Sequence, residues 1–318
     1  MGRVLALCMV LGSLAGAADR DRDGVDDALE QMLIEQFRPH FLVSSRECAQ
    51  VPAEFEAFSV RPRVRAHNAA IYARVSPSTL QGPDGPALEI HYYHLWERDC
   101  GQLASHALDV EHVSALLVPS ANGWTARSWY AAAHEGTVCD TSNAARAEAI
   151  GAVSSGPRVW ISAGKHASYL SQELCRQRGC GGDDCRDMVD LPHGPLINLG
   201  EAQAPLNGAV WTASREWPFE SKLGSAFHAE LLGQLEESDD TVVARVNGQW
   251  RPTQFSISIG DDTIGALGTA GRHGDGGMAE AEEHTGNALG KTWRAFSRAM
   301  GHAARAVGLT ESTDDPYE

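Results

Sequence analysis

The clearest pattern of hydrophobic and polar positions lies in residues 87–118, where two apolar stretches flank a polar loop. In the second stretch polar and apolar side chains alternate, and this period of two predicts a strand with one face against a core. Asp109 and Glu111 fall on the same face of that strand, and the face continues with Val113 and further apolar residues. We therefore expect two carboxylates side by side at one end of a buried sheet.

Short apolar stretches separated by Gly, Pro and Asn turns recur along most of the chain. They predict a mainly β protein, an antiparallel β-sandwich with short helices. Asn-Gly pairs at residues 122–123 and 247–248 are typical of hairpin turns. Further strands are expected at residues 68–75, 124–134, 158–162, 209–212 and 241–246, a helix at residues 27–37, and a second helix that ends before Cys175.

The two ends of the chain differ from this central part. Arg3, the apolar residues 4–14 and the small residues 15–17 have the form of a signal peptide, since the apolar run is too short to span a bilayer. Near the other end, one apolar face predicts an amphipathic helix, which packs on its own domain or binds a membrane surface or a partner. The expected organisation is a signal peptide (1–18), an acidic loop with a helix (19–37), the β-sandwich domain (38–262), a glycine-rich linker (263–278), the amphipathic C-terminal helix (279–311) and a disordered tail (312–318).

Net charge narrows the range of partners. The 318 residues carry a formal net charge of −16, which argues against a nucleic-acid partner because phosphate binding needs a basic face. Hydrophobic residues make up 43% of the chain, enough for a sizeable core, and no stretch after the expected signal peptide predicts a transmembrane segment. The expected signal peptide predicts a secreted or periplasmic protein, and the acidic composition fits this prediction.

Six cysteines are left once the expected signal peptide is removed, and an even number in an exported chain indicates disulfides. We expect one or two bridges within the closely spaced group Cys175, Cys180 and Cys185. A metal site in this group is an alternative, although its spacing is not C-x2-C, and free buried thiols are another. The disulfide candidates are Cys48, Cys100, Cys139, Cys175, Cys180 and Cys185.

An acidic stretch follows the expected cleavage site and fits the calcium-loop pattern D-x-D-x-D-G-x5-E. Alternate side chains of such a loop fold inward around one Ca²⁺ ion, and Gly24 permits the sharp turn. We expect a structural calcium site that fixes the start of the following helix; a solvated acidic tail is the alternative. The expected calcium ligands are Asp19, Asp21, Asp23, Val25, Asp27 and Glu30.

A second candidate metal site lies around the loop between the two central stretches. Asp99 ends the first strand, and His106 leads into the second strand, three residues before Asp109. With Glu111, these residues offer carboxylate oxygens and one imidazole, which suit Ca²⁺, Mg²⁺ or Mn²⁺ better than Zn²⁺. Two like charges beside an apolar face also favour a bound cation. The alternative is a set of solvated acids at strand ends.

Residues 99–113, D-C-G-x4-H-A-L-D-V-E-H-V, resemble the G-H-R-H-D-W-E heptad of secreted necrosis-inducing (Nep-like) proteins and the G-D-W-E-H-V segment of related vacuolar protein sorting-associated proteins. Residues 129–136 and 159–169 resemble further segments of the second group. The resemblance implies a β-sandwich and a divalent cation held by the four residues of the second candidate metal site. Leu108 and Val110 stand where the heptad has His and Trp, so it implies the cation site more strongly than plant-cell-lysing activity.

Two histidines outside that set are candidate proton carriers. His134 would lie near the cation end of the sheet if residues 124–134 form one strand, and His166 follows a short strand at a turn. Each has a structural alternative, a surface position for His134 and a capping or hydrogen-bonded position for His166.

Three functions fit these sites. In the first, which the resemblance implies, the cation helps the protein bind a glycan or glycolipid head group. In the second, a metal-dependent hydrolase uses a cation-activated water, with His134 or His166 carrying the proton. In the third, the chain is a structural envelope protein whose ions serve stability alone.

Overall fold

The computed structural model describes residues 19–49, 51–56, 63–66, 68–83, 85–100, 105–178, 183–199, 222–238 and 241–256. The expected signal peptide, the strand at residues 209–212, the glycine-rich linker, the C-terminal helix and the tail lie outside the described residues. The chain divides into two compact units, Met1–Ile259 and Gly260–Glu318, and every described residue belongs to the first unit.

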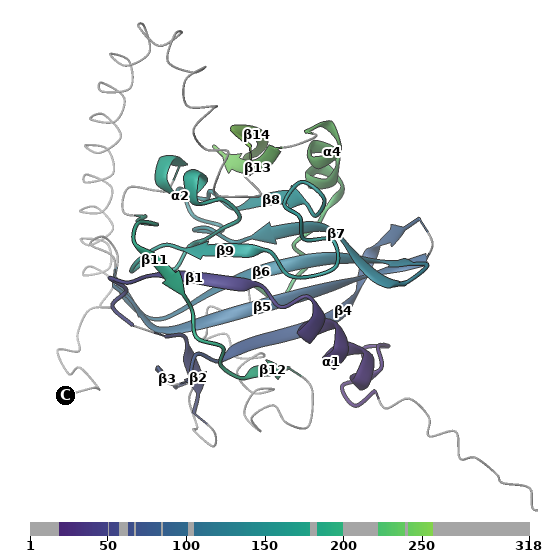
Figure 1. The fold of residues 1–318 in the computed structure, drawn as a ribbon, viewed down its shortest axis with the longest axis horizontal. Helices are drawn as coiled ribbons and strands as arrows, with labels where there is room; N and C mark the ends of the chain where they lie inside the picture. Colours follow the sequence, from purple (N-terminus) through teal and green to yellow (C-terminus); the bar gives the residue numbers. More distant parts are fainter. Residues whose placement is uncertain are drawn as a thin grey trace, which may run out of the picture. The chain divides into compact units, whose positions relative to one another are not determined.

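A large, mostly antiparallel sheet forms the centre of this unit (Figure 1). Its strands, in spatial order, are β12 (Leu196–Asn198), β4 (Ile71–Gly82), β5 (Gly85–Asp99), β6 (His106–Ser120), β7 (Gly123–Ala131), β8 (Asn143–Arg146), β13 (Thr241–Val246) and β14 (Gln249–Ser256). In the longest pairing, β5 with β6, Trp96 lies opposite Asp109 and His94 lies opposite Glu111. This register places both acids on the face of the sheet that carries Trp96, because directly opposed residues share a face.

A second, four-stranded sheet lies on that face. It has the order β10 (Ser168–Tyr169), β9 (Arg158–Ile161), β1 (His40–Ser44) and β11 (Met188–Asp190). A separate hairpin is formed by β2 (Ala53–Phe55) and β3 (Val64–Ala66), and the described helices are α1 (Asp27–Gln36), α2 (Gln172–Arg178) and α4 (Ala229–Glu237). None of the helices in the described ranges is long and apolar enough to cross a membrane.

The main core lies between the two sheets. Tyr92, Trp96 and Trp129 of the large sheet are fully buried there, and they belong to one cluster with Phe41 of β1 and Val159 of β9. Burial of each such side chain contributes about 1.5 to 3 kcal/mol of hydrophobic stabilisation. Two sheets packed face to face around one core confirm the predicted β-sandwich.

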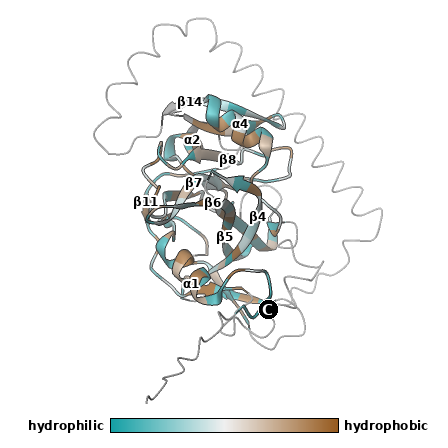
Figure 2. Ribbon diagram, turned by 90° about the vertical axis from the view of Figure 1, so that its right-hand side faces the viewer, coloured by the Kyte–Doolittle hydropathy of each residue, from teal (hydrophilic) through white to brown (hydrophobic). Residues whose placement is uncertain are grey.

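Helices complete the core at two places. Figure 2 shows α1 and α4 at opposite ends of this unit, each with both hydrophobic and hydrophilic residues. α1 begins where the side chain of Asp26 accepts hydrogen bonds from the backbone N–H groups of Ala28 and Leu29, both at 3.1 Å. The hydroxyl of Tyr92 donates to the carbonyl of Ile34 at 3.0 Å and so fixes the end of α1 on the sheet. The predicted helix at residues 27–37 is therefore confirmed.

Several local predictions are confirmed, and others are corrected. Both Asn-Gly hairpins form, between β6 and β7 and between β13 and β14. The sandwich is not wholly antiparallel, because β1 pairs with β9, and β12 with β4, in parallel. The predicted strand at residues 68–75 begins later, at Ile71, and runs to Gly82.

The prediction of a helix that ends before Cys175 is wrong. The chain turns tightly after β9, where His166 adopts a φ of 53° and its backbone N–H donates to the carbonyl of Ser162 at 2.9 Å. It then runs back as β10 instead of starting a helix, and Cys175 lies inside the later helix α2.

Candidate functional site

A group of charged and polar side chains fills the end of the large sheet where β7 leaves β6. The β6–β7 pairing ends at Val113 and Ala131, and just beyond it the N–H of Ala132 donates to the carbonyl of His112 at 2.9 Å. This leaves room beside the first residues of β6 for side chains from other segments. We call these residues the polar cluster: Glu47, Asp99, Asp109, Glu111, His112, His134, Glu135, Lys165, His166, Asp183 and Lys222.

His166 lies at the centre of the polar cluster and is fully buried. Its Nδ1 is 2.7 Å from a carboxylate oxygen of Asp109, and its Nε2 is 3.3 Å from a carboxylate oxygen of Glu47. Burial acts to lower the pKa of His166, but the hydrogen bonds to the two carboxylates outweigh it and raise that pKa to about 9. Burial alone would raise the pKa values of Asp109 and Glu47, but His166 lowers both. The three side chains therefore form a buried carboxylate–imidazolium–carboxylate group.

Glu111 is the second buried acid of β6. Its carboxylate accepts a hydrogen bond of 2.8 Å from the ammonium of Lys222, and the two side chains are 7% and 11% exposed. Burial raises the pKa of Glu111 to about 7; the charge of Asp109 adds to this shift, and Lys222 opposes it. Asp109 and Glu111 thus lie side by side with pKa values displaced in opposite directions.

Asp99 and His106 form a separate pair of the predicted cation set. They lie opposite each other at the ends of β5 and β6, with His106 Nε2 3.8 Å from the carboxylate of Asp99. Lys165 donates to the same carboxylate at 2.9 Å. The side chain of His106 is 54% exposed, whereas that of Asp99 is 9% exposed.

The four predicted ligands of the central cation therefore reach one end of the β5–β6 hairpin as two pairs. Among the described residues, no three of them place ligand atoms within 4.8 Å of one another. A different group, Glu47, Cys48, Cys100 and His166, meets that distance. Its two sulfur atoms form a disulfide, so they are not thiolate ligands for a metal.

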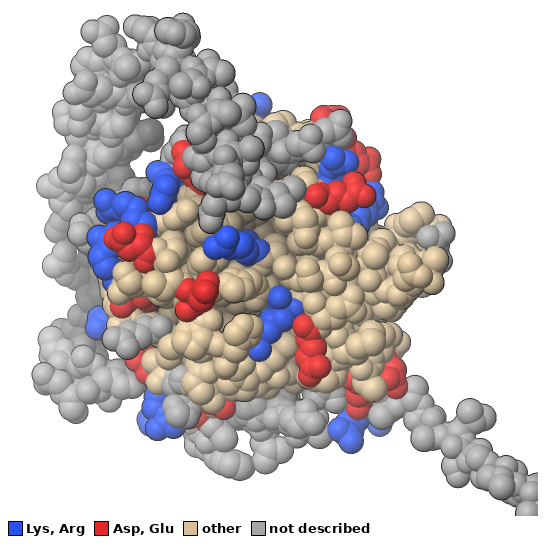
Figure 3. Space-filling model, in the orientation of Figure 1, with Lys and Arg blue, Asp and Glu red and all other residues tan. Residues whose placement is uncertain are grey.

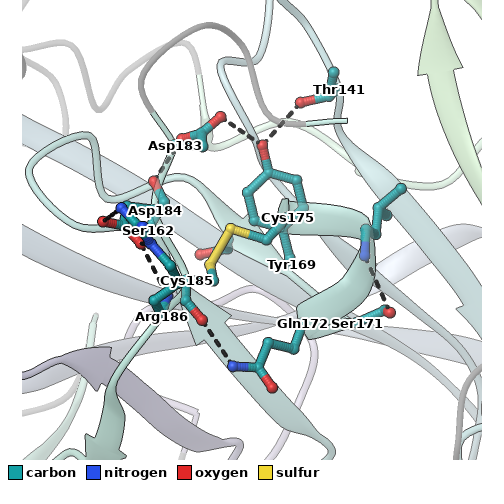
Figure 4. Close-up of a disulfide and its surroundings, with 12 residues drawn as sticks. Thr141, Ser162, Tyr169, Ser171, Gln172, Cys175, Asp183, Asp184, Cys185 and Arg186 are labelled. Carbon is teal, nitrogen blue, oxygen red and sulfur yellow. Dashed lines mark hydrogen bonds and ion pairs between the residues drawn. A yellow bond between two sulfur atoms is a disulfide. The ribbon is translucent and has the colours of Figure 1, made fainter. Parts of the chain in front are cut away.

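Within the polar cluster, His134 is held by Asp183. The strand expected at residues 124–134 ends at Ala131, and His134 follows it in a turn with a φ of 54°. Its Nε2 is 2.8 Å from Asp183, whose carboxylate also accepts hydrogen bonds from Ser162 at 2.6 Å and Tyr169 at 2.9 Å (Figure 4).

This arrangement sets the charge and the direction of His134. Burial acts to lower the pKa of His134, but the hydrogen bond and charge of Asp183 raise it, and Glu111 adds to the rise. A carboxylate that orients a histidine in this way is an arrangement that proton-transfer enzymes use.

A third carboxylate–histidine pair lies on the other face of β6. His112 Nε2 is 3.2 Å from Glu135, which also accepts a hydrogen bond of 2.5 Å from the hydroxyl of Tyr130. Burial acts to raise the pKa of Glu135, but these two contacts and the charge of Lys222 lower it to about 2. Hydrogen bonds also link His112 to Ser114, at 3.3 Å, and Ser114 to His91, at 2.8 Å.

Sequence reasoning did not identify Glu47, Glu135, Asp183 or Lys222 as members of the site. Glu47 and Asp183 each lie close to a cysteine of a disulfide, so the cysteine pairing was the signal that would have found them. Glu135 directly follows His134. Lys222 is 111 residues away from its partner Glu111, and no local pattern marks it.

The structure contains the disulfides Cys48–Cys100 and Cys175–Cys185. The second confirms the expected bridge within the closely spaced group, and it joins α2 to the segment that carries Asp183 (Figure 4). Cys139 is also disulfide-bonded, and the remaining candidate, Cys180, lies outside the described residues.

The N-terminal acidic loop gathers the first three expected calcium ligands. Carboxylate oxygens of Asp19, Asp21 and Asp23 lie within 4.8 Å of one another. Gly24 has a φ of 98°, and its N–H donates to Asp19 at 3.2 Å, which closes the loop. Burial and the neighbouring Asp23 raise the pKa of Asp21.

The later expected calcium ligands have other contacts. Asp27 accepts a hydrogen bond of 2.9 Å from the backbone N–H of Arg20. The side chain of Glu30 is buried and accepts a hydrogen bond of 2.9 Å from the side chain of Asn198. Val25 is buried, and its N–H donates to Asp23 at 2.9 Å. The loop thus resembles the first half of a calcium loop more than its second half.

Comparison with known proteins gives similarity to solved structures, at a low level. No family model and no curated protein matches the chain. One similar solved structure, described as "Toxin fold as basis for microbial attack and plant defense", has 15% identity and a TM-score of 0.33 over 56% of this chain and 79% of that chain. Another, "NLPPya in complex with mannosamine", has 16% identity and a TM-score of 0.34 over 61% of this chain and 80% of that chain. With TM-scores this low, we transfer neither a site nor a function from these structures.

Proposed function

We propose that the chain is an exported protein whose polar cluster binds a divalent cation and, through that cation, recognises the hydroxyl groups of a glycan or glycolipid head group. The observation that carries this proposal is the placement of Asp109 and Glu111 side by side on one buried face of β6. Two carboxylates in such a place need positive charge nearby, because burial penalises each charge and each repels the other.

Two basic side chains lie beside these carboxylates. Asp109 is matched by His166, and Glu111 by Lys222. A divalent cation would bring two charges to one point and take the place of the ammonium of Lys222 beside Glu111. Oxygen ligands of this kind suit Ca²⁺, Mg²⁺ or Mn²⁺, and Asp99 and His106 are the other two ligands of the predicted set.

A cation at the end of the sheet would have a direct use in recognising sugars. Hard cations accept hydroxyl oxygens as ligands, so neighbouring hydroxyls of a glycan can complete a shell that the protein leaves open. The disulfides fit export, because such bonds form and persist in oxidising compartments.

The N-terminal loop is proposed as a separate, structural calcium site. Its three clustered carboxylates support this role, and so do two buried oxygens, one each on Asp19 and Asp23, that have no hydrogen-bond partner among the described residues. Calcium there would neutralise the charge immediately before α1 and hold the start of the helix.

A second candidate function is hydrolysis. The specific observation in its favour is His134, which Asp183 orients and charges close enough to Glu111 for the two side chains to shift each other's pKa. In that case a water bound to the cation would be the nucleophile, and His134 would carry the proton. A structural role for the ions is the third outcome that the following experiment separates.

The decisive experiment measures metal content by elemental mass spectrometry. Mature wild-type protein, the near-isosteric variant D109N/E111Q and the control D190N, which removes an exposed acid, are stripped with EDTA and reloaded in turn with Ca²⁺, Mg²⁺ and Mn²⁺. We expect the double variant to lose one ion equivalent and to keep the ion of the N-terminal loop. Equal metal content in all three folded proteins would rule out the proposed central cation site.

Glycan-array binding by the same proteins, with and without the ion, then separates the functions. Cation-dependent binding that D109N/E111Q lacks supports recognition. Cation-dependent cleavage of a bound glycan that is lost in H134Q supports hydrolysis. A bound ion with neither effect supports the structural role.

A further inference from the structure

A cavity of about 590 Å³ lies apart from the polar cluster, between α1, the start of β1 and the segment before β12. A volume of this size is typical of sites for small ligands. The lining residues are Gln31, Glu35, Arg38, Pro39, His40, His193 and Leu196. Five of the seven carry polar or charged side chains, which can bind the polar groups of a ligand.

Arg38 is the residue that sets the chemistry of this cavity. Its guanidinium is half-buried, and burial lowers its pKa. One nitrogen donates to the carbonyl of Gly194 at 3.0 Å, and among the described residues no carboxylate lies within 4.0 Å of the group. A partly desolvated cation without an anionic partner is unfavourable, and a planar guanidinium matches a carboxylate through two parallel hydrogen bonds.

The other lining residues favour a singly charged anion that also carries hydroxyls. Glu35 lines the same cavity and is held by the side chain of Gln31 at 2.6 Å, so its negative charge opposes a doubly charged phosphate. His40 is 2.8 Å from Asp190, a further acid close to the cavity. Gln31, Glu35 and His193 can exchange hydrogen bonds with hydroxyl groups.

The walls of the cavity are fixed before any ligand binds. The backbone of Gly194 lies so close to that of residues 68–69 that a Cβ there would be 1.9 Å from the carbonyl oxygen of Asn68. At the start of β1, the N–H of the lining residue His40 donates to the carbonyl of Pro157 at 2.8 Å. A preformed wall lowers the entropy lost on binding.

We propose that this cavity binds a small hydroxylated ligand with one carboxylate, such as a sugar acid, and that Arg38 holds the carboxylate. The site is separate from the polar cluster and does not depend on a bound cation. Arg38 would make the ionic contact, and the hydroxyls of the ligand would be shared among Gln31, Glu35 and His193.

Isothermal titration calorimetry on the mature full chain tests this proposal. The probes are D-galacturonate, D-galactose, which lacks the carboxylate, and inorganic phosphate. We expect galacturonate to bind and the other two to bind at least tenfold more weakly. In R38Q, galacturonate affinity should fall at least tenfold, whereas the matched control R158Q should keep it. Arg158 is an exposed arginine of β9 that stacks on Trp160 and lies opposite the lining residue His40. It is not one of the lining residues, so R158Q removes a nearby positive charge and leaves the lining intact.

Figure 3 shows that basic and acidic side chains are interspersed over the face that carries α1 and β1, so a general field of positive charge does not explain selective binding. Equal weakening in R38Q and R158Q would overturn the proposal, as would equal binding of galacturonate and galactose or no binding of galacturonate at all. R38K provides a second variant if R38Q does not fold: it keeps the charge and loses the planar fork, and unchanged affinity in R38K would overturn the two-point contact.

Discussion

The imidazole of His166 stacks on the indole of Trp96, with ring centroids 4.1 Å apart and an angle of 6° between the rings. A protonated imidazole gains from such a face-to-face contact with an electron-rich ring. Together with two flanking carboxylates, the indole makes a site inside the sandwich in which a charged histidine is more stable than a neutral one. The charge of His166 is thus a property of the fold.

Replacing His166 by Gln should destabilise the protein strongly. The change leaves the carboxylates of Asp109 and Glu47 buried without their shared cation, and breaking a buried pair in this way costs about 3 to 5 kcal/mol. The measurement is the free energy of unfolding in urea at pH 7 with EDTA present. The control is H40Q, where an exposed histidine loses an exposed partner, Asp190, and little change is expected. Comparable losses in both variants would contradict the buried ion group.

Two buried groups with raised pKa values, Glu111 and His166, should make stability depend on pH in two adjoining windows. The pKa of Glu111 is about 7 in the folded protein and near 4.5 when unperturbed, so the folded state binds more protons between these values. Stability therefore falls as pH rises from about 4.5 to 7. For His166, raised from 6.5 to about 9, stability is full below pH 6.5 and is lost as pH rises through 9.

Urea midpoints measured from pH 4.5 to 9.5 without divalent cations check both windows. E111Q should remove the pH dependence of the urea midpoint only between about pH 4.5 and 7. H166Q should remove it only between about pH 6.5 and 9. A wild-type midpoint that is constant across both windows would contradict the two raised pKa values.

Replacing Lys222 by Met should tighten cation binding. The ammonium of Lys222 lies beside Glu111, where the proposed divalent cation would bind. Without it, a cation no longer has to displace a buried charge, and we expect about tenfold higher affinity, or about 1.4 kcal/mol. Calorimetric titration with Ca²⁺ and Mn²⁺ measures the change. The control K165M removes the ammonium that pairs with Asp99 and should have a smaller effect, while weaker binding in K222M would refute the competition.

The two described disulfides should contribute unequally to stability. Cys48 and Cys100 are 52 residues apart, and Cys175 and Cys185 are 10 residues apart. In the chain-entropy account, closing the longer loop stabilises the folded state by about 4 kcal/mol and closing the shorter loop by about 3 kcal/mol. Urea unfolding of the two double Cys→Ser variants tests this order. A larger loss for the shorter loop would show that native contacts, and not loop length, dominate.

Calcium should raise the melting temperature through the N-terminal loop. An ion that binds only the folded state stabilises it by about 2.7 kcal/mol at a hundred times its dissociation constant. D21N/D23N removes two of the three clustered carboxylates and should abolish the shift, whereas E148Q, which removes an exposed acid elsewhere, should keep it. The test uses differential scanning calorimetry in the D109N/E111Q background, so that any central ion does not contribute. An equal shift in both variants would contradict a calcium site in the loop.

Sequence patterns predicted the parts of the fold that neighbouring residues determine. The Asn-Gly turn at residues 122–123 joins two strands directly, and the side chain of Asp26 starts α1 within three residues of its own position. The alternation along β6 also placed Asp109 and Glu111 correctly on one face, because a strand has a strict period of two.

The rest depends on contacts between distant segments. β1 and β9 pair in parallel although more than a hundred residues separate them, and nothing local in either strand specifies its neighbour. Lys222 reaches Glu111 in the same way, through tertiary structure alone. The turn at His166 was misjudged because a residue with positive φ looks the same in a sequence whether a helix or a strand follows it.

The short helix α1 connects the acidic loop to the cavity. It has ten residues and therefore spans about 15 Å. Its first turn is capped from the loop, while Glu35 near its other end and Arg38 just beyond it form part of the cavity wall. Local unfolding of α1 would therefore disturb both the end of the acidic loop and the cavity wall at Arg38. Protection of α1 amides from hydrogen exchange would report on both places at once.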